Sequence, residues 1–434
     1  MELDLAALNV ETHKALSLVL LGAEGEVTDR GVIATEDIPP HTVIASIPLN
    51  STISAQGLLD NVDEFSALST FANTSSRITD DDLIAIAIIL SRKDTGAGCD
   101  NAYLQRFNGF CMNFPSTFDS TIFLSPGSLP HNLLKGTNLL HSTMMLQNQI
   151  AQDHAILLKL LQDFAMVHSD MRGFFPTTSE TFPLEDYVHG LFSVYSRACD
   201  LSMSISGRTA GRVRLLCPFL DMLNHSSSSK VFYEFDSGAV KIKTGDREIK
   251  KGSEVTLNYG PLTNAKLLLF YGFSLENNDY DDAELYVPLN PDLPLYKEKL
   301  GLLKKLDAMY DSTNSFRIKK GEDIPNTLLA LLRLMPLTSL ENVNAEEVIT
   351  SENEFGVLNA LESALQSMSQ IISGNLLVVG DDRKKEEDTG MIAEYEKVRI
   401  YVESELEILS TALGVVRSGI AKLHSAESGL EECD

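Results

Sequence analysis

The chain has few cysteines, and none of them is paired in the sequence. Its five cysteines (Cys99, Cys111, Cys199, Cys217 and Cys433) are an odd number, lie far apart and include no CxxC motif. Structural zinc clusters and disulfide frameworks need such pairs at regular spacing, so neither organises this protein. We therefore expect no metal site and a reducing compartment.

Long apolar runs are also missing. No stretch approaches the roughly 18 apolar residues that a membrane-spanning helix needs. The start, MELDLAALNVETHK, carries acids early and lacks the basic segment of a signal peptide and the acid-poor composition of a transit peptide. We expect no membrane association and a cytoplasmic or nuclear protein, or an organellar one if a longer natural N-terminus has been removed.

Positive charge is scarce. Lys and Arg number 35 against 61 Asp and Glu, a formal net charge of −26. This balance argues against a nucleic-acid surface and suits a basic or flexible segment of a protein partner, although acidity can also serve solubility alone. We expect a monomer that acts on a protein.

The common nucleotide and hydrolase motifs are absent. The sequence has no P-loop, GxSxG or HExxH motif. Asp29-Arg30-Gly31 lacks the GxGxxG pattern and the βαβ surroundings of a dinucleotide fold. ATP-binding, serine-hydrolase, zinc-protease and Rossmann interpretations therefore fail.

At 434 residues the chain exceeds one typical domain of about 100–200 residues. Two β-rich parts, roughly 22–56 and 212–260, flank a helical insertion at about 80–195. Isolated hairpins are marginally stable, so the two β parts should pack together in one domain of residues 1–287. The rest, 288–434, has helical periodicity and no long strand pattern. The predicted fold class is α+β, with a helical C-terminal domain.

Local patterns predict individual elements. A helix is expected over 4–21, and a hairpin at 32–44 around Pro39-Pro40. Segments 37–44 and 248–255 share the order acid, Ile, turn and β-branched strand, a pattern common enough to arise twice by chance. Further helices are predicted at 80–92, 137–168, 184–196, 263–271, 294–310, 325–334, 355–372 and 391–418, strands at 231–235, 239–244 and 254–258, and a loop at 380–388.

Four polar landmarks stand at the ends of these elements. Asn224-His225 ends an apolar strand, where buried polar groups need specific partners. Tyr259 ends the last strand beside Gly260, and Tyr271-Gly272-Phe273 closes the following helix. Arg197 ends another helix, where a cation complements the helix dipole. In isolation each also has a purely structural interpretation: a backbone brace, a strand-end aromatic, a helix cap and a dipole partner.

Taken in order, the motifs resemble one family. DRGVIATEDI, SRA, PFLDMLNH, REIKKGSEVTLNYG and LLLFYGF follow one another as in SET-domain methyltransferases related to the Rubisco large-subunit lysine methyltransferase and the actin-histidine methyltransferase. YLQRFNGF, STIFLSPGSL and LLKGT are similar to the helical insertion of that family. The helical C-terminal third corresponds in position to its substrate-binding domain.

The resemblance implies a protein methyltransferase that uses S-adenosyl-L-methionine. It assigns to the cofactor pocket Arg30, Gly31, Arg197, Asp221, Met222, Leu223, Asn224, His225, Tyr259, Tyr271 and Phe273. Arg197 would hold the cofactor carboxylate by charge-assisted hydrogen bonds. Tyr259 would be the catalytic residue, aligning the sulfonium methyl with the attacking amine.

Two departures from the family leave the target open. Asp29 stands where the family usually has Gly, in the loop assigned to the cofactor. Cys199 stands where the lysine enzymes often have Phe and the histidine enzyme has Asn. No cysteine-rich module follows the domain, unlike typical histone-tail SET enzymes. We expect lysine methylation of a non-histone protein. Histidine methylation and a catalytically silent scaffold are the alternatives, and the retained Tyr259 speaks against silence.

Overall fold

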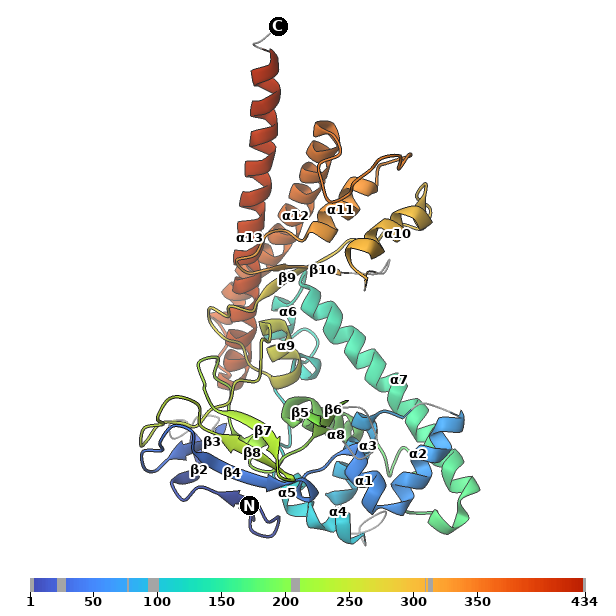
Figure 1. Ribbon diagram of the computed structural model, residues 1–434, viewed down its shortest axis with the longest axis vertical. Helices are drawn as coiled ribbons and strands as arrows, with labels where there is room; N and C mark the ends of the chain where they lie inside the picture. The colour runs from blue at the N-terminus through green and yellow to red at the C-terminus, as the bar shows by residue number, and fades with distance from the viewer. Residues whose placement is uncertain are drawn as a thin grey trace. The chain divides into compact units, whose positions relative to one another are not determined.

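The computed structural model describes residues 4–21, 29–75, 78–92, 101–203, 211–308, 310 and 315–431. The chain forms two compact units (Figure 1). Unit 1 contains Met1–Phe118 and Leu146–Gly260, and unit 2 contains Asp119–Met145 and Pro261–Asp434. Helices and strands both contribute, so the α+β class is confirmed. The domain border near residue 287 stays a prediction. Within the described ranges, no helix combines the length and the apolar character that crossing a membrane requires.

The strands of unit 1 form short antiparallel sheets. One sheet has four strands in the order β1-β4-β8-β7, and two further pairs join β2 to β3 and β5 to β6. Their bounds are β1 (Glu11–Thr12), β2 (Leu16–Leu21), β3 (Asp29–Ala34), β4 (Val43–Pro48), β5 (Cys199–Met203), β6 (Gly211–Leu215), β7 (Phe232–Asp236) and β8 (Ala239–Lys243). Buried residues recur along β4 and β8, as expected for strands with one face on a core. The predicted strands at 231–235 and 239–244 are confirmed.

Two predictions near the N-terminus are wrong. The helix expected over 4–21 is instead β1 and β2, because short leucine-rich runs fit either period and here Leu16–Leu21 finds a strand partner in β3. The hairpin expected at 32–44 does not form. Its two strands enter different sheets: β3 pairs with β2, whereas β4 pairs with β1 and β8. The Pro39-Pro40 turn therefore carries the chain from one sheet to another.

The two segments that echo each other lie side by side as partners. The amide of Ile38 donates to the carbonyl of Ile249 (2.8 Å), and the amide of Ile249 donates to the carbonyl of Ile38 (3.0 Å). Further along, the amide of Ala34 donates to Ser253 and the amide of Gly252 donates to Ala34. Equivalent turns thus meet across a local pseudo-twofold axis, and the echo has a structural counterpart.

The helices of unit 1 pack around α3 (Asp80–Ser91). A capping box between Thr79 and Asp82 starts this helix, and every residue from Leu83 to Ser91 is buried. It packs against α8, where a Cβ on Gly190 would lie 3.1 Å from the Cβ of Ala85, so a larger residue at 190 would push the two helices apart by a few tenths of an ångström. The other helices here are α1 (Ala55–Asn61), α2 (Asp63–Ser75), α4 (Ala102–Arg106), α5 (Asn108–Met112) and α8 (Leu184–Arg197), with α7 (Asn138–Val167) extending across both units' residue ranges. The predictions for α3, α7 and α8 are confirmed.

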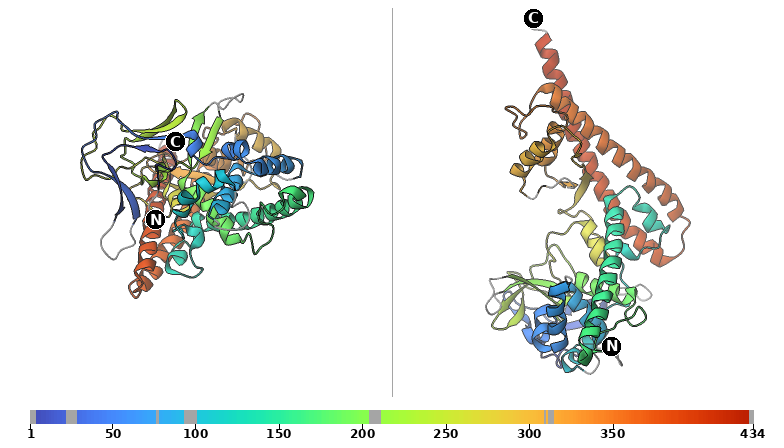
Figure 2. Two further views of the ribbon diagram at one scale, coloured as in Figure 1. Left: turned by 90° about the horizontal axis from the view of Figure 1, so that it is seen from below. Right: turned by 90° about the vertical axis from the view of Figure 1, so that its right-hand side faces the viewer.

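Unit 2 is mainly helical, as expected, and its two longest helices run side by side (Figure 2). Two short strands, β9 and β10, which pair with each other, were not predicted from the sequence. The elements are α6 (Leu129–Leu133), α9 (Asn264–Lys266), the π-helical η5 (Leu267–Tyr271), β9 (Asp282–Tyr286), α10 (Tyr296–Leu306), β10 (Ser315–Lys319), α11 (Asn326–Leu334), α12 (Ser351–Arg383) and α13 (Thr389–Glu431). The expected loop at 380–388 is helical up to Arg383, because α12 continues into the charged run.

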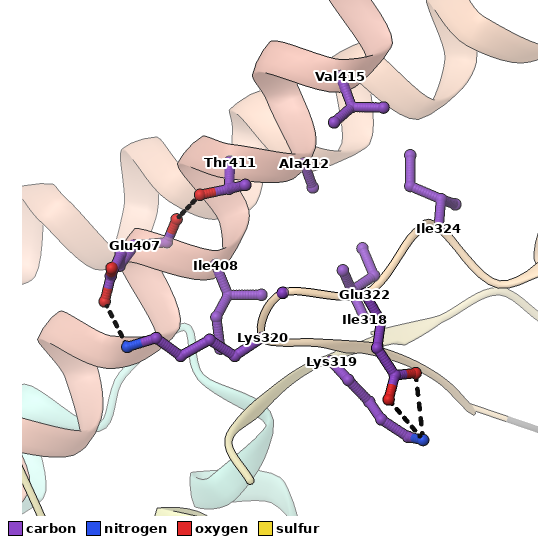
Figure 3. Close-up of a pocket in the computed structure, with 11 residues that line it drawn as sticks. Ile318, Lys319, Lys320, Glu322, Ile324, Glu407, Ile408, Thr411, Ala412 and Val415 are labelled. Carbon is purple, nitrogen blue, oxygen red and sulfur yellow. Dashed lines mark hydrogen bonds and ion pairs between the residues drawn. The ribbon is translucent and has the colours of Figure 1, made fainter. Parts of the chain in front are cut away.

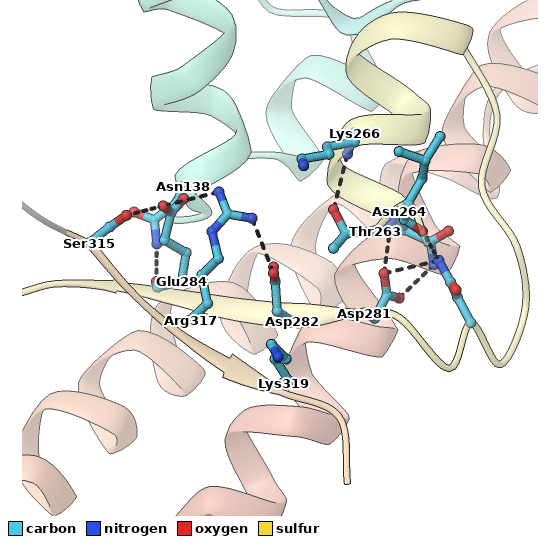
Figure 4. Close-up of polar contacts among 12 residues, drawn as sticks. Asn138, Thr263, Asn264, Lys266, Asp281, Asp282, Glu284, Ser315, Arg317 and Lys319 are labelled. Atoms are coloured by element: carbon cyan, nitrogen blue, oxygen red, sulfur yellow. Dashed lines mark hydrogen bonds and ion pairs between the residues drawn. The ribbon is translucent and has the colours of Figure 1, made fainter. Parts of the chain in front are cut away.

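A polar network in unit 2 joins α9 to β9 and α13 (Figure 4). The carboxylate of Asp281 accepts from the side-chain amide of Asn264 (2.7 Å), from its backbone amide (2.5 Å) and from the hydroxyl of Ser404 (2.6 Å). Next to Ser404, Glu405 is 2% exposed and faces this acidic region. Burial raises the pKa of Glu405 to about 8, its hydrogen bond with Tyr401 opposes this, and the charges of Asp282, Glu284 and Asp281 add to it.

This environment predicts a pH-dependent contribution to stability. The folded pKa of Glu405 lies above the unfolded value of about 4.3, so the folded state holds a proton that the unfolded state releases. The contribution is present below about pH 4.3 and falls by up to about 1.4 kcal/mol per pH unit as pH rises to about 8. In Glu405→Gln, which stays neutral, that slope should disappear.

The measurement is urea unfolding at several pH values for the parent and Glu405→Gln. The free energy of unfolding of the parent should fall relative to the variant between pH 5 and pH 8 and then level. Parallel curves would show that Glu405 is ionised in the folded protein.

Candidate functional site

Backbone pairing in unit 1 brings three predicted segments together. The amide of Val255 donates to the carbonyl of Val32 in β3 (2.7 Å). Two residues on, the amide of Leu257 donates to the carbonyl of Asn224 (2.8 Å), and its carbonyl accepts from Ser226 (3.0 Å). The predicted strand at 254–258 is thus extended and lies between β3 and the Asn224–Ser226 segment, forming only isolated bridges with them. Arg30 and Gly31, Asn224 and His225, and Tyr259 become neighbours in this way.

A strained turn introduces the segment from Asp221 to His225. Phe219 has φ +76° and ψ −43°, a conformation that non-glycine residues rarely adopt, and it is buried. The 3₁₀ turn η4 (Leu220–Met222) follows directly. Met222 and Leu223 are buried, so among the predicted residues these two anchor the segment in the core through their side chains. The turn leaves Asp221 facing the end of α8.

Arg197, the last residue of α8, forms an ion pair with Asp221. Its Nη1 donates to the carboxylate oxygen Oδ2 (3.1 Å) and to the carbonyl of Asp221 (3.3 Å). The Asp221 side chain is fully buried, and the Arg197 side chain is 17% exposed. The guanidinium also lies over the ring of Phe114, with 5.5 Å from Cζ to the ring centroid.

Two buried polar atoms of this pair have no hydrogen-bond partner among the described residues: Nε of Arg197 and Oδ1 of Asp221. A buried unsatisfied donor or acceptor costs about 1–3 kcal/mol, so such atoms are rare in native proteins. Here a donor and an acceptor remain on one ion pair. They match the carboxylate and the ammonium of an amino acid, which would satisfy both.

The electrostatics of the cluster favour an anion. Burial raises the pKa of Asp221, and the charge of Arg197 opposes this. Burial also lowers the pKa of Arg30, as does the charge of Arg197, while Asp221 raises it. Arg30 Nη2 donates to the carbonyl of Asn113. Two guanidinium groups therefore act on one carboxylate, which leaves one positive charge in excess among these three groups.

His225 and Tyr259 are fixed to each other. The backbone amide of Tyr259 donates to Nδ1 of His225 (3.1 Å), and the Tyr259 hydroxyl donates to the carbonyl of Leu223 (2.8 Å). Burial lowers the pKa of His225, so the ring is neutral at pH 7, and an accepting Nδ1 places its proton on Nε2. Because the Tyr259 hydroxyl donates its hydrogen to the carbonyl of Leu223, its oxygen acts toward any further polar group as an acceptor.

Two further predicted site residues, Tyr271 and Phe273, belong to unit 2. Gly272 has φ +77° and caps η5, and a Cβ on it would lie 2.8 Å from that of Asp119, so the predicted helix end is confirmed. The rings of Tyr271 and Phe273 lie edge to face with centroids 6.2 Å apart. Their assignment to the cofactor pocket stays a prediction.

Sequence reasoning missed several contacts of the site. Phe114 and Asn113 lie more than 80 positions in sequence from their partners, Arg197 and Arg30, and carry no local signal, since a phenylalanine in an irregular segment is ordinarily core. Glu254, which accepts from Asn224, lies within a motif that the sequence singled out only for its strand pattern. The thiols of Cys199 and Cys217 are 3.5 Å apart and buried, so Cys199 contacts another cysteine.

No group of three or more His, Cys, Asp or Glu side chains in the described part of the chain is arranged to hold a metal ion. A small hollow of about 40 Å³ lies in unit 2 between the end of β10 and α13, with an apolar floor and charged edges (Figure 3). Ligand pockets measure about 300–1,000 Å³, so this one is too small for a cofactor. An adjoining hollow of about 460 Å³ carries charges of both signs, from Asp307, Arg317, Lys319, Glu322 and Asp323.

Comparison with known proteins gives the same architecture. Residues 29–260 match the SET domain, and residues 290–397 match the Rubisco LSMT substrate-binding domain. The SET domain of LSMT solved with methyllysine and AdoHcy has a TM-score of 0.74 at 20% identity, over 96% of this chain and 91% of that one. Rubisco LSMT solved with AdoMet gives 0.69 at 19% identity, over the same shares. These structures support the fold.

The chain therefore belongs to the SET-domain family. More particularly, it pairs a SET domain with a match to the Rubisco LSMT substrate-binding domain, as the sequence motifs predicted. The ribosomal lysine N-methyltransferase set10 of Schizosaccharomyces pombe is 30% identical over 171 residues, 38% of this chain and 31% of that protein. The actin-histidine N-methyltransferase of Mus musculus is 24% identical over 247 residues, 56% of this chain and 39% of that protein. The aligned part thus spans about a third of the length of these two relatives.

The buried ion pair predicts a large stability effect. In Asp221→Ala the guanidinium of Arg197 loses its buried partner, and the free energy of unfolding should fall by about 3 kcal/mol. Urea unfolding at pH 7 measures this. Asp163→Ala is the control, since it breaks the exposed pair with Lys159 and should cost less than about 1 kcal/mol. Equal losses in both variants would show that Asp221 is not a buried partner.

Proposed function

We propose that this chain is an S-adenosyl-L-methionine-dependent protein methyltransferase that methylates lysine in a non-histone protein. The observation that carries the proposal is the pair of unsatisfied buried atoms on Arg197 and Asp221, one donor and one acceptor. A ligand that completes both atoms must offer an acceptor to Nε and a donor to Oδ1, as the carboxylate and ammonium of an amino acid do. The methionine end of S-adenosyl-L-methionine is such a group.

The relatives agree with this proposal. Solved LSMT structures hold AdoMet or AdoHcy, and some hold lysine or methyllysine as well. Of the curated relatives, set10 is a ribosomal lysine N-methyltransferase and another is an actin-histidine N-methyltransferase. Lysine is therefore our first assignment. Histidine is the alternative target, and it is kept because the actin-histidine relatives align over a larger share of this chain than set10 does.

The cofactor residues have separate tasks. Arg197 would hold the carboxylate through Nε, and its stacking on Phe114 keeps the guanidinium plane fixed. Asp221 would accept from the ammonium through Oδ1. His225, neutral and with its Nδ1 accepting from the amide of Tyr259, would keep the segment that carries Asn224 next to Tyr259. Tyr271, the last residue of η5, and Phe273 are assigned to the cofactor by the sequence motif alone.

Tyr259 would align the reacting groups. S-Adenosyl-L-methionine supplies a methyl group activated by its positively charged sulfur. The Tyr259 oxygen, which donates its own proton to Leu223, can accept a hydrogen bond from the incoming amine. It thereby fixes the direction of attack, a gain from proximity rather than from proton transfer.

The target amine must reach the site without its proton. A lysine amine loses its charge more readily when it leaves water and when a positive sulfur approaches, since both disfavour the ammonium form. The net charge of −26 would attract a basic or flexible segment of the substrate protein from solution. We assign substrate binding to residues 288–434, which include the match to the Rubisco LSMT substrate-binding domain.

The first test is cofactor binding. Isothermal titration calorimetry should show S-adenosyl-L-methionine binding to the parent protein and at least tenfold weaker binding to Arg197→Ala, since a charge-assisted hydrogen bond is worth about 1.5–3 kcal/mol. Arg212→Ala is the matched control, because Arg212 is 78% exposed and pairs only loosely with Asp200 (3.7 Å). Absence of binding by the parent protein would overturn the proposal.

The second test is methyl transfer. With methyl-labelled cofactor and cell lysate, Tyr259→Phe should lower protein labelling by at least tenfold, because it removes the hydroxyl that would align the amine. Cofactor affinity should change little, because the hydrogen bond to Leu223 that is also lost is one within the protein. Mass spectrometry of the labelled protein should find methyllysine. Methylhistidine would select the second assignment, and unchanged labelling would remove Tyr259 from the mechanism.

A further inference from the structure

The side-chain amide of Asn224 is held by two acceptors. Its Nδ2 donates to the backbone carbonyl of Arg30 in β3 (3.0 Å) and to Oε1 of Glu254 (2.8 Å). Glu254 reaches this position because it forms a bridge with Ile33 at the edge of β3, while the next residue, Val255, is buried. Both NH₂ hydrogens of Asn224 therefore have a partner on the same two neighbouring segments.

These partners determine which way the amide points. A backbone carbonyl and a carboxylate can only accept hydrogen bonds, so neither tolerates the amide oxygen in place of the NH₂ group. The usual ambiguity between the oxygen and the nitrogen of an asparagine does not arise here. Oδ1 must face away from Arg30 and Glu254. Asn224 thus presents an acceptor, and not a donor, to the site.

We propose that Glu254 is a positioning residue, which acts through Asn224 and fixes its amide so that Oδ1 accepts from the ammonium of the cofactor. This inference rests on the proposed function and concerns the same pocket. Asp221 and Asn224 then offer two acceptors to a group with three N–H donors, opposite the carboxylate held by Arg197.

Glu254 itself is exposed, which separates positioning from folding. Exposed polar pairs contribute little to the free energy of unfolding. When Glu254 is removed, the carbonyl of Arg30 remains as one acceptor, so the amide can rotate and direct NH₂ toward the site for part of the time. In that orientation the NH₂ group faces the ammonium, and two donors cannot form a hydrogen bond with each other. Cofactor binding is weakened while the protein stays folded.

The experiment compares Glu254→Ala and Glu254→Gln with the parent protein by calorimetry with S-adenosyl-L-methionine. Glu254→Ala should raise the dissociation constant about five- to tenfold, the range expected for one hydrogen bond. Glu254→Gln keeps an oxygen that can accept from Nδ2 and should stay within about twofold of the parent. Glu248→Ala is the control, because Glu248 lies in the same segment, 248–255, and pairs with exposed Lys250. It should leave binding unchanged.

A double-mutant cycle identifies the route. In Asn224→Ala, adding Glu254→Ala should cause no further loss, because the amide on which Glu254 acts is absent. Thermal unfolding should give the same midpoint for the parent and both Glu254 variants within about 2 °C.

The outcomes separate the two proposals. If the parent binds the cofactor and Glu254→Ala binds equally well, the positioning role is wrong and the proposed function stands. If Glu254→Gln is as weak as Glu254→Ala, the negative charge of Glu254 matters and not the orientation of Asn224, which also overturns the inference. If the parent does not bind, both proposals fall.

Discussion

The site of unit 1 depends on backbone hydrogen bonds between residues far apart in sequence. Segment 37–44 pairs with segment 248–255, and β3 is joined to Val255 by the same ladder. Contacts between segments some 200 residues apart close a long loop, which costs entropy that the contacts must offset. The pocket therefore exists only when both ends of unit 1 have come together.

A second constraint is the burial of charge. Arg197 and Asp221 lie at the end of α8 and after the strained turn at Phe219, and neither side chain has enough water around it to be solvated separately. Breaking such a pair is costly, and a pair that also leaves a donor and an acceptor unsatisfied is costly even when intact. A folded protein retains such an arrangement where a ligand completes it. The same reasoning explains why the strain at Phe219 is tolerated, since that turn directs Asp221 to its partner.

Sequence reasoning identified the parts of the site whose signal is local. Asn224-His225 and Tyr259 follow apolar strand patterns at points where a polar side chain is unusual, and Arg197 ends a clear helical period. The helices α3, α7 and α8 have long periodic patterns and were predicted with nearly correct bounds. The N-terminal helix was mispredicted because Leu16–Leu21 is short and apolar, and only its pairing with β3 decides between helix and strand.

What the sequence could not supply were the partners. Phe114 beneath Arg197, Asn113 beside Arg30 and Glu254 beside Asn224 each come from another segment, and no local pattern identifies them as partners of these site residues. The β9–β10 pair was missed for another reason. Buried residues alternate with less buried ones along both strands, but a run of five residues is too short to predict a strand without its partner.

These partners also account for the kind of chemistry that the site can perform. Tyr259 donates to Leu223, His225 accepts from Tyr259 and Asn224 donates to Arg30 and Glu254. These hydrogen bonds fix the orientation of each of the three side chains. None of the three is placed to act as a general base, because the basic nitrogen of the neutral His225 ring already accepts a hydrogen bond. Methyl transfer from a sulfonium needs little proton transfer and much alignment, so fixed orientation is the property that this reaction requires.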